Sequence, residues 1–239
     1  ACDDFFPKQS FSSRRQKFEP GSYGITEQSL KMTVQDKVRL SVSIFPTLIT
    51  SSPQSLIEFG QFSLVLDPAG HVSFSVGSNN VTTVDAISIR SWHRVEAQIS
   101  TTGLMSIKLI NLSNSTNSKP TDIQIDLEPD LNEQAHVIIA AKRIERSTKN
   151  CFNGKIEHPE ICADGQIIAF WDFSENISSF SVPGAKCPDL TLVNAPTRAV
   201  TGAMWDASEM NWQHKPQHYA AIAFHEDDIY DFNWEADFS

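Results

Sequence analysis

The stretch KVRLSVSIF at residues 37–45 decides the expected fold, because its apolar and polar side chains alternate with a period of two. Side chains of a β-strand point alternately to the two faces of a sheet, whereas those of a helix repeat about every 3.6 residues. The stretch therefore predicts a half-buried strand that rests on an apolar core. One face carries Val38, Leu40, Val42 and Ile44, and the other carries Arg39, Ser41 and Ser43.

Runs of the same kind recur at intervals that leave room for turns but not for helices. They lie at residues 62–66, 72–76, 92–99 and 104–110, and the turn sequences DPAG, GSNN and TTG follow three of them. Later candidates are residues 135–141, 154–157 and 167–173, while residues 112–120 are expected to form an exposed loop. Short strands joined by turns are typical of antiparallel sandwiches. We predict an all-β, two-sheet antiparallel jelly-roll sandwich over residues 20–175, after an N-terminal arm at residues 1–19.

The position of Trp92 conflicts with the alternation around it. Val95, Ala97 and Ile99 form the apolar face of the run, and Trp92 has the opposite parity. We nevertheless expect Trp92 to be buried on the core face, because a tryptophan packed on a sheet contributes more buried area than any neighbour. Either Trp92 precedes the strand or a bulge shifts the register there.

Composition and charge exclude several classes of function. The chain has 239 residues with 19 basic and 29 acidic side chains, a net charge of −10, which disfavours nucleic acid as a partner. No apolar run approaches the roughly 18 residues of a membrane-spanning helix. We expect a soluble protein without a membrane partner, and a cytoplasmic rather than a secreted one.

The four cysteines show no metal-binding or redox spacing. Cys2, Cys151, Cys162 and Cys187 contain no Cys-x-x-Cys pair, which disfavours a structural zinc site. A bridge between Cys151 and Cys162 would be possible if that stretch formed a hairpin, and two buried thiols are the alternative.

The last quarter of the chain, the extension at residues 176–239, loses the alternation from Asn194 onward and gathers aromatic, histidine and acidic residues. So many aromatic side chains would not stay exposed to solvent, and too few regular apolar faces remain for a separate core. We expect an extension that packs on the sandwich and joins it to a downstream domain absent from this fragment, or to a second copy of the chain. The predicted interface residues are Trp205, Trp212, His214, His218, Tyr219, His225, Asp227, Asp228 and Trp234.

The histidines of this extension allow a second interpretation, in which they bind a divalent metal. His214 and His218 stand four residues apart, which would place both on one face of a helix, but Pro216 between them disfavours a regular helix. We expect these histidines to pack and hydrogen-bond at the domain junction, with no metal ligand and no catalytic residue in this chain.

Two carboxylate patterns also have a functional and a structural interpretation. The sequence EDDIYD at residues 226–231 approximates the Glu-x-Asp-x-Glu strand of sandwich-fold glucanases, but Tyr230 stands in place of the last glutamate. Asp67 could lend an oxygen to calcium, although DPAG is first of all a β-turn. We therefore expect a turn at Asp67, and an independent glycosidase is our third choice of function.

Several short segments resemble, in their order, the laminin G-like domains of the concanavalin A-like group. They are GSYG at residues 21–24, the strand that ends in FPT at residues 45–47, SWHRV at residues 91–95, the turn at Gly103, and FNGKI at residues 152–156. This resemblance implies the same two-sheet jelly roll.

A sharper resemblance lies downstream. The segments WDFS (171–174), NAPTRAVTG (194–202), WQHKP (212–216), YAAIAFHEDD (219–228) and WE (234–235) resemble the large, beta subunit of the N,N-dimethylformamidase family. In that family a laminin G-like domain precedes this junction and a catalytic body follows it. Ala203, Met204 and Ala223 depart from the histidines and asparagine that relatives tend to carry, so a histidine-based site here would be depleted.

The resemblance implies a parent amidohydrolase that cleaves formamide C–N bonds with a mononuclear iron and has small-subunit partners. Its iron ligands, tyrosines and a carboxylate, are expected beyond residue 239. We therefore expect a non-catalytic interaction module that packs against the catalytic body or other subunits of the same enzyme. The alternative is a lectin-like, carbohydrate-binding sandwich, for which a glycan would be the partner.

Overall fold

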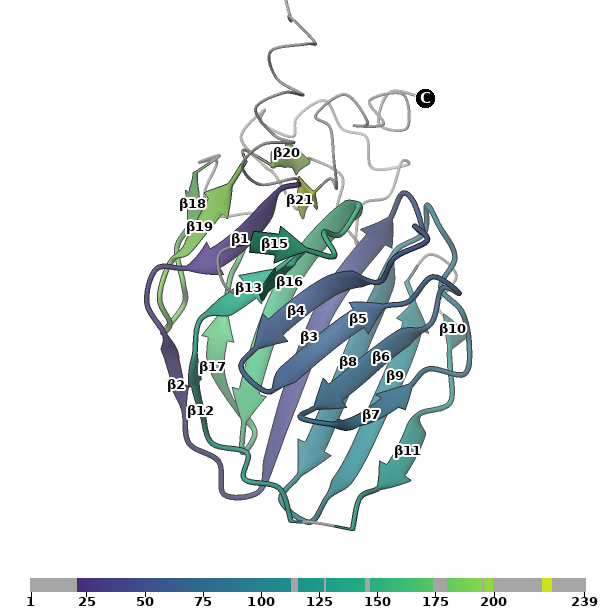
Figure 1. Ribbon diagram of the computed structural model, residues 1–239, viewed down its shortest axis with the longest axis vertical. Helices are drawn as coiled ribbons and strands as arrows, with labels where there is room; N and C mark the ends of the chain where they lie inside the picture. The colour runs from purple at the N-terminus through teal and green to yellow at the C-terminus, as the bar shows by residue number, and fades with distance from the viewer. Residues whose placement is uncertain are drawn as a thin grey trace, which may run out of the picture.

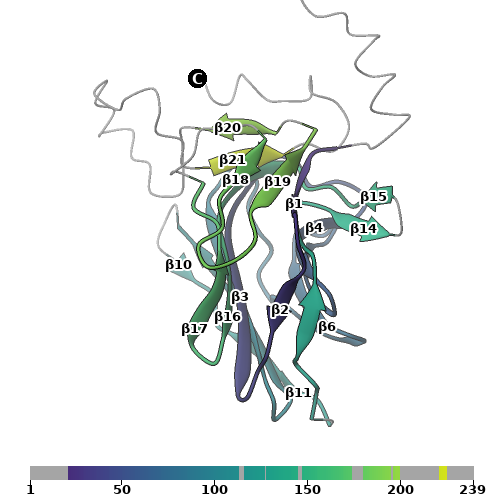
Figure 2. The same cartoon turned by 90° about the vertical axis from the view of Figure 1, so that its left-hand side faces the viewer.

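A computed structural model describes residues 21–112, 116–126, 128–144, 147–173, 180–194, 196–199 and 221–224. Its elements in this part of the chain are all β-strands, and their pairings are antiparallel. Two large sheets face one another, as the two views of the chain show (Figures 1 and 2). The predicted all-β, two-sheet antiparallel sandwich is therefore confirmed. Within the described ranges, no helix has the length and apolar character that crossing a membrane would require.

The first sheet has eight strands and is formed mainly by the hairpins of the first half of the chain (Figure 1). Strand β1 joins the later strands β13 and β19, so segments more than a hundred residues apart lie side by side. Its order is β18 (Ser181–Val182), β19 (Leu190–Val193), β1 (Tyr23–Thr26), β13 (Val137–Ile139), β4 (Gln54–Phe59), β5 (Phe62–Leu66), β6 (Val72–Val76) and β7 (Asn79–Thr82).

The second sheet has nine strands and contains the two longest, β3 and β16, at its centre. Its main path is β10 (Thr116–Asn117), β9 (Leu104–Asn111), β8 (His93–Ser100), β3 (Lys37–Pro46), β16 (Gly154–Ala163), β21 (Ala221–Phe224) and β20 (Thr197–Ala199). Two further strands, β11 (Thr121–Gln124) and β17 (Gln166–Phe170), pair with β9 and β16 respectively.

Two small two-stranded sheets complete the fold. Strand β2 (Leu30–Met32) pairs with β12 (Glu133–Ala135), and β14 (Lys142–Ile144) pairs with β15 (Ser147–Lys149). Leu30 and Met32 are buried and belong to the core. In Figure 2, β2 lies on the near side of the sandwich between its two layers. The β2–β12 pair therefore covers one open side of the core.

The core fills the space between the two large sheets. The apolar face of β3, from Val38 to Ile44, is fully buried, and so are the matching positions Val72 and Phe74 of β6. All of these residues belong to one apolar cluster. Burial of this area is the main driving force of the fold, because each apolar Å² removed from water contributes about 25 cal/mol.

The predicted strands match the observed ones where the two faces of a strand differ in polarity. The runs at residues 62–66 and 72–76 are β5 and β6 without change of bounds. The run at residues 135–141 is divided between β12 and β13, which belong to different sheets. The expected loop at residues 112–120 contains the short strand β10, which pairs with β9.

The predicted boundary at residue 175 does not mark the end of the sheets. Strands β18 and β19 join the first sheet, where β19 pairs with the open edge of β1. Strands β20 and β21 join the second sheet, where β21 pairs with β16. The sandwich therefore includes described residues from 180 to 224. The predicted N-terminal arm at residues 1–19 and the end of the extension, residues 225–239, lie outside the described residues.

Trp92 is buried, as expected, with 8 % of its surface exposed. It precedes β8, which starts at His93, and it lies on the same side of the sheet as Arg94, as the parity of the run requires, so its expected place on the core face is wrong. Its indole packs against Phe45 and Leu112 on the outer side of the second sheet, apart from the main core. The ring centroids of Trp92 and Phe45 are 5.6 Å apart.

The described cysteines, Cys151, Cys162 and Cys187, are not joined to one another by disulfides. Cys151, buried among Tyr23, Ile138 and Ala141, lies on the first sheet's side, whereas Cys162 lies on β16 of the second sheet. A bridge between Cys151 and Cys162 is therefore not formed.

Asp67 forms the expected turn. Its Oδ1 accepts hydrogen bonds from the backbone N–H groups of Ala69 and His71, both at 2.8 Å.

His93 occupies the inward-facing position at the start of β8 and should make stability depend on pH. Its Nδ1 lies 2.9 Å from the Ser91 carbonyl oxygen, its Nε2 accepts a weak bond from the Ser88 N–H, and burial lowers its pKa. An unfolded histidine titrates near about pH 6.5, so below that pH the unfolded state takes up the proton first. Stability should be greatest above about pH 6.5 and fall below it, by at most about 1.4 kcal/mol per pH unit.

The His93→Gln variant should lose this part of the pH dependence, because glutamine keeps a donor and an acceptor but does not titrate. Urea unfolding of both proteins between about pH 7.5 and pH 5 measures the two slopes. Equal slopes for the two proteins would contradict the assignment to His93.

Candidate functional site

The nine predicted interface residues lie outside the described part of the chain. These are Trp205, Trp212, His214, His218, Tyr219, His225, Asp227, Asp228 and Trp234, and the EDDIYD pattern lies there too. The interface therefore stays a prediction. The described residues bring together a different set of polar side chains, on the outer face of the second sheet.

This face is polar because alternate residues of β3, β8 and β16 point away from the core. Arg39, Ser41 and Ser43 are the outward positions of β3, the polar face already visible in the sequence. Cross-strand pairing sets each beside outward residues of the neighbouring strands. The pairs are Ser43 with Arg94 and Glu157, Ser41 with Glu96 and Glu160, and Arg39 with Gln98 and Cys162.

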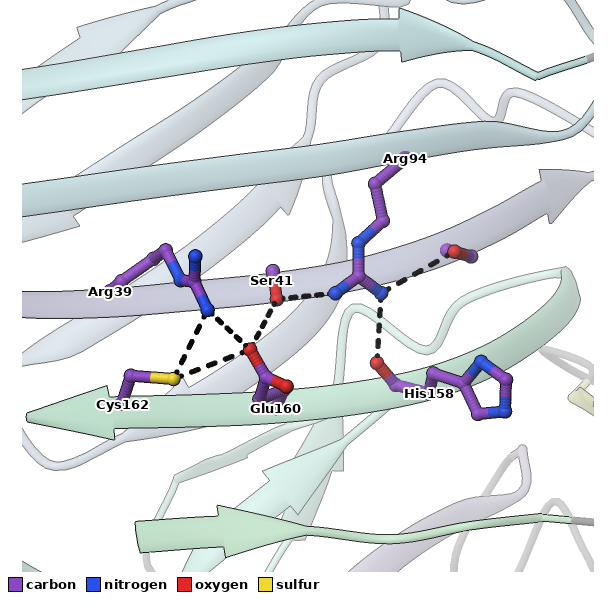
Figure 3. Close-up of polar contacts among 7 residues, drawn as sticks. Arg39, Ser41, Arg94, His158, Glu160 and Cys162 are labelled. Atoms are coloured by element: carbon purple, nitrogen blue, oxygen red, sulfur yellow. Dashed lines mark hydrogen bonds and ion pairs between the residues drawn. The ribbon is translucent and has the colours of Figure 1, made fainter. Parts of the chain in front are cut away.

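A β-bulge in β16 aims part of its backbone at this face. The register with β3 shifts between Glu157 and Glu160, and His158 has a φ of 48° in the left-handed region. Pro159 has no N–H to donate, which favours such an interruption of the ladder. The bulge keeps Glu157 and Glu160 opposite outward serines of β3 and presents the His158 carbonyl oxygen to Arg94 (Figure 3).

We call the residues drawn in Figure 3 the Arg94 cluster; they are Arg39, Ser41, Ser43, Arg94, His158, Glu160 and Cys162.

Glu160 connects one half of this cluster. Its Oε1 accepts from Arg39 Nη2 at 2.8 Å, from Cys162 Sγ at 3.3 Å and from Ser41 Oγ at 3.4 Å (Figure 3). The Glu160 side chain is 13 % exposed while that of Arg39 is 45 % exposed, so the ion pair reaches from a covered position to the surface. Burial raises the pKa of the Cys162 thiol, which keeps it protonated and a poor nucleophile near neutral pH.

Arg94 forms the other half; among the described residues its hydrogen-bond acceptors are hydroxyl and carbonyl oxygens, and Glu160, Glu96 and Glu157 act on its charge from farther away. Its Nη2 donates to Ser41 Oγ at 2.6 Å, and its Nη1 donates to the His158 carbonyl oxygen at 3.0 Å and to Ser43 Oγ at 3.4 Å. Burial lowers the pKa of Arg94, because the charged guanidinium is partly removed from water. It stays protonated, since arginine does not lose its proton in proteins.

Two further groups border the Arg94 cluster. Toward the Gly154 end of β16, Lys155 Nζ lies 5.3 Å from the centroid of the Phe45 ring, which in turn packs on Trp92. On the bulge, the His158 ring lies 3.6 Å from a Glu157 oxygen and 3.8 Å from an Asp172 oxygen. The arrangement can bind a polar or charged group, with cations, carboxylates and hydroxyls side by side.

The described residues offer no ligand set for a metal ion. The described ranges contain no group of three histidine, cysteine, aspartate or glutamate side chains that could hold a metal ion. Tyr23 is the tyrosine within these ranges, and it is buried in an apolar cluster with Ile138 and Cys151. These residues do not fit the tyrosine and carboxylate ligands that the family resemblance implies for iron.

The Arg94 cluster is not among the site residues predicted from the sequence. Its members come from strands far apart in the chain, and only their pairing makes them neighbours. One signal was available: EHPE at residues 157–160 interrupts the alternation of β16 with a proline between two glutamates. Such an interruption indicates a bulge, and bulges often redirect side chains near functional sites.

Comparison with known proteins gives one relation in sequence. No protein-family profile matches the chain. Part of the chain is similar to the beta subunit of N,N-dimethylformamidase. The proteins of Paracoccus aminophilus and of an Alcaligenes species are each 35 % identical to it over 112 residues. Each match covers 36 % of this chain and 15 % of the relative, so the chain corresponds to a small part of those subunits.

Solved structures show more distant likenesses. A proposed carbohydrate-binding protein from Bacteroides ovatus has 12 % identity and a TM-score of 0.49, over 74 % of this chain and 58 % of its own. A pentraxin from Limulus polyphemus has 13 % identity and a TM-score of 0.45, over 59 % and 70 %. The LG1–3 region of the laminin alpha2 chain has 16 % identity and a TM-score of 0.43, over 60 % and 31 %.

Proposed function

We propose that this chain is a non-catalytic, laminin G-like module of an N,N-dimethylformamidase-like large subunit and that it packs against the catalytic body of that enzyme. The observation that carries the proposal is the stretch of 112 residues that is 35 % identical to the beta subunits of two such enzymes. The activity and the partners of the whole enzyme are part of this proposal.

The strand pairing near the end of the described chain supports an anchored module. Strand β21 pairs with β16 from Gly154 to Ile156, and β20 pairs with β21. Both strands come from the downstream segments whose motifs resemble the beta subunit. Because they are hydrogen-bonded into the second sheet, the position of Phe224 relative to the sandwich is fixed. A fixed position there suits a domain that must hold its neighbour in one orientation.

The chemistry of the described side chains supports a non-catalytic role for them. Cys162 is protonated and Tyr23 is buried among apolar groups. We infer that the iron of the parent family, with its tyrosine and carboxylate ligands, is held by residues of the enzyme outside this chain.

Two assays with the purified 239-residue chain test the proposal. With N,N-dimethylformamide or formamide as substrate, it should release no formate above a buffer control. When it is mixed with the polypeptide encoded by the rest of the same enzyme's gene, the two should elute together from a sizing column. Formate release by the chain alone, or separate elution at micromolar concentration, would contradict the proposal.

A carbohydrate-binding role is the alternative. Sugars usually stack on an exposed aromatic ring beside polar groups, and the aromatic pair Phe45 and Trp92 borders the Arg94 cluster. Trp92 is largely buried, however, which leaves little of its ring for a sugar. Saturable binding on a glycan array by the intact chain would place this alternative first.

A further inference from the structure

Asn153 and Gly154, at the start of β16, form the one Asn-Gly pair of the sequence. This pair is prone to deamidation, because glycine has no side chain to shield its backbone nitrogen from the asparagine side chain before it. The Gly154 nitrogen attacks Asn153 Cγ, a C–N bond forms, and the side-chain nitrogen leaves as ammonia with the Gly154 amide proton. Water then opens the cyclic succinimide to aspartate or to isoaspartate. The reaction needs no reagent other than water.

The fold holds Asn153 away from the geometry of this attack. The Thr47 N–H donates to the Asn153 carbonyl oxygen at 3.1 Å, and the Thr47 hydroxyl donates to that oxygen and to the side-chain Oδ1, each at 3.2 Å. The Asn153 N–H donates to Gln54 Oε1 at 2.8 Å. The rotations that would bring Cγ to the next backbone nitrogen must therefore break these bonds.

Gly154 is confined in the same way. It pairs with Pro46 of β3 on one side and with Phe224 of β21 on the other. A Cβ atom on it would lie 2.3 Å from the Phe45 carbonyl oxygen and 2.8 Å from Phe152 Cζ. A succinimide ring has no room between these neighbours.

Water is kept from the same place. Asn153 is 8 % exposed, and Gln54, which accepts its N–H, is fully buried. The folded chain thus opposes both steps, ring closure and hydrolysis.

We propose that Asn153 is a latent deamidation site, blocked in the folded chain and open to reaction whenever the start of β16 separates from β3. The rate of conversion then follows the population of this open form, as hydrogen exchange and proteolysis of a protected segment do.

Conversion to isoaspartate makes the opening irreversible. Isoaspartate carries an additional methylene in the backbone, so its N–H and its carbonyl oxygen cannot both meet Gln54 and Thr47 as Asn153 does. It also places a carboxylate in a covered position, which costs free energy. Because β16 pairs with β3 at the centre of the second sheet, a chain changed at this point should not refold. This inference does not depend on the proposed function.

Peptide mapping by mass spectrometry of the 239-residue chain gives the first test. The chain is incubated in mildly alkaline buffer with and without urea, and conversion of Asn153 is followed in time. In native buffer the conversion should be at least about a hundredfold slower than in urea, because it waits for an opening of a central strand. Equal rates in the two solutions would show that the fold does not block the reaction.

The matched control is Asp164→Asn, which creates the same dipeptide with Gly165 in an exposed turn. A Cβ atom on Gly165 would meet nothing within 4 Å, in contrast to Gly154. In the folded variant, position 164 should convert well before Asn153, and in urea the two positions should convert at similar rates. Conversion of Asn153 first in the folded variant would contradict the inference.

Thr47→Val tests the contacts that hold Asn153. This change removes the hydroxyl that bonds both oxygens of Asn153 and keeps the branched shape, so conversion in native buffer should rise about tenfold. The control is Thr50→Val in the same loop, where the hydroxyl donates to the Ser52 carbonyl oxygen instead. Equal conversion in the two variants would overturn the role assigned to Thr47.

Refolding of partly converted chain tests the consequence. The chain is incubated in urea until a fraction of Asn153 has reacted and is then diluted into native buffer, and a sizing column separates folded from unfolded or aggregated material. Isoaspartate at position 153 should be confined to the material that has not refolded. If folded protein contains it in the same proportion, deamidation at this site does not make the opening irreversible, and the inference is wrong.

Discussion

Replacement of Gly154 by alanine should prevent folding or lower the free energy of unfolding by more than about 4 kcal/mol. A Cβ atom at this position would lie 2.3 Å from the Phe45 carbonyl oxygen and 2.9 Å from the Pro46 Cα. Both are backbone atoms of β3, to which Gly154 is paired, so they cannot move away without breaking the centre of the second sheet. The φ of 156° adds backbone strain for any other residue.

The matched control is Gly77→Ala. Gly77 also has a positive φ, of 58°, but a Cβ there would meet nothing within 4 Å. Its cost should therefore be the backbone strain alone, about 1–2 kcal/mol. Equilibrium unfolding in urea measures both variants. A stable Gly154→Ala protein within about 1 kcal/mol of the Gly77→Ala protein would show that β3 can yield at this point.

The strands that sequence alone located share one property, which is a difference in polarity between their faces. Strand β5 alternates buried and half-buried residues without interruption, and it was predicted with its observed bounds. Strand β4, from Gln54 to Phe59, was not predicted, because four consecutive residues at its start are buried. The buried polar residues Gln54 and Ser55 find partners that only the tertiary structure supplies, the Leu48 carbonyl and the Glu58 carboxylate.

The candidate site could be predicted only in part for a related reason. The outward positions of β3 follow from the period of two, so Arg39, Ser41 and Ser43 were assigned to the polar face correctly. Their partners Arg94 and Glu160 are 53 and 119 residues away from Ser41 along the chain. Strand order decides which residues meet, and the apolar pattern of a strand carries no information about its neighbour. The bulge at His158 adds a carbonyl oxygen that no side-chain pattern reveals.

Trp171→Ala should destabilise the protein by about 3–5 kcal/mol, the usual cost of removing a large aromatic side chain from a core. Trp171 is fully buried, and its Nε1 donates to the Pro188 carbonyl oxygen at 3.0 Å. Its backbone also forms an isolated bridge with Gly184. Trp171 therefore connects the end of β17 in the second sheet to the segment that carries β18 and β19 in the first.

The place of Trp171 between the two sheets predicts which strand should lose protection from hydrogen exchange when the indole is removed. Loss of the indole should increase hydrogen exchange of the β19 amides from Leu190 to Val193. Trp171 contacts Gly184 and Pro188 just before β19, and these contacts help to hold β19 against β1. Trp171→Phe keeps most of the volume and loses the hydrogen bond to Pro188, so it should cost about 1–3 kcal/mol and disturb β19 less. Trp92→Ala is a second control, because Trp92 packs in a separate small cluster on the outer face. If β19 keeps its protection in Trp171→Ala, or loses it equally in Trp92→Ala, then Trp171 does not join the two sheets, and β19 is held by its pairing with β1 and β18.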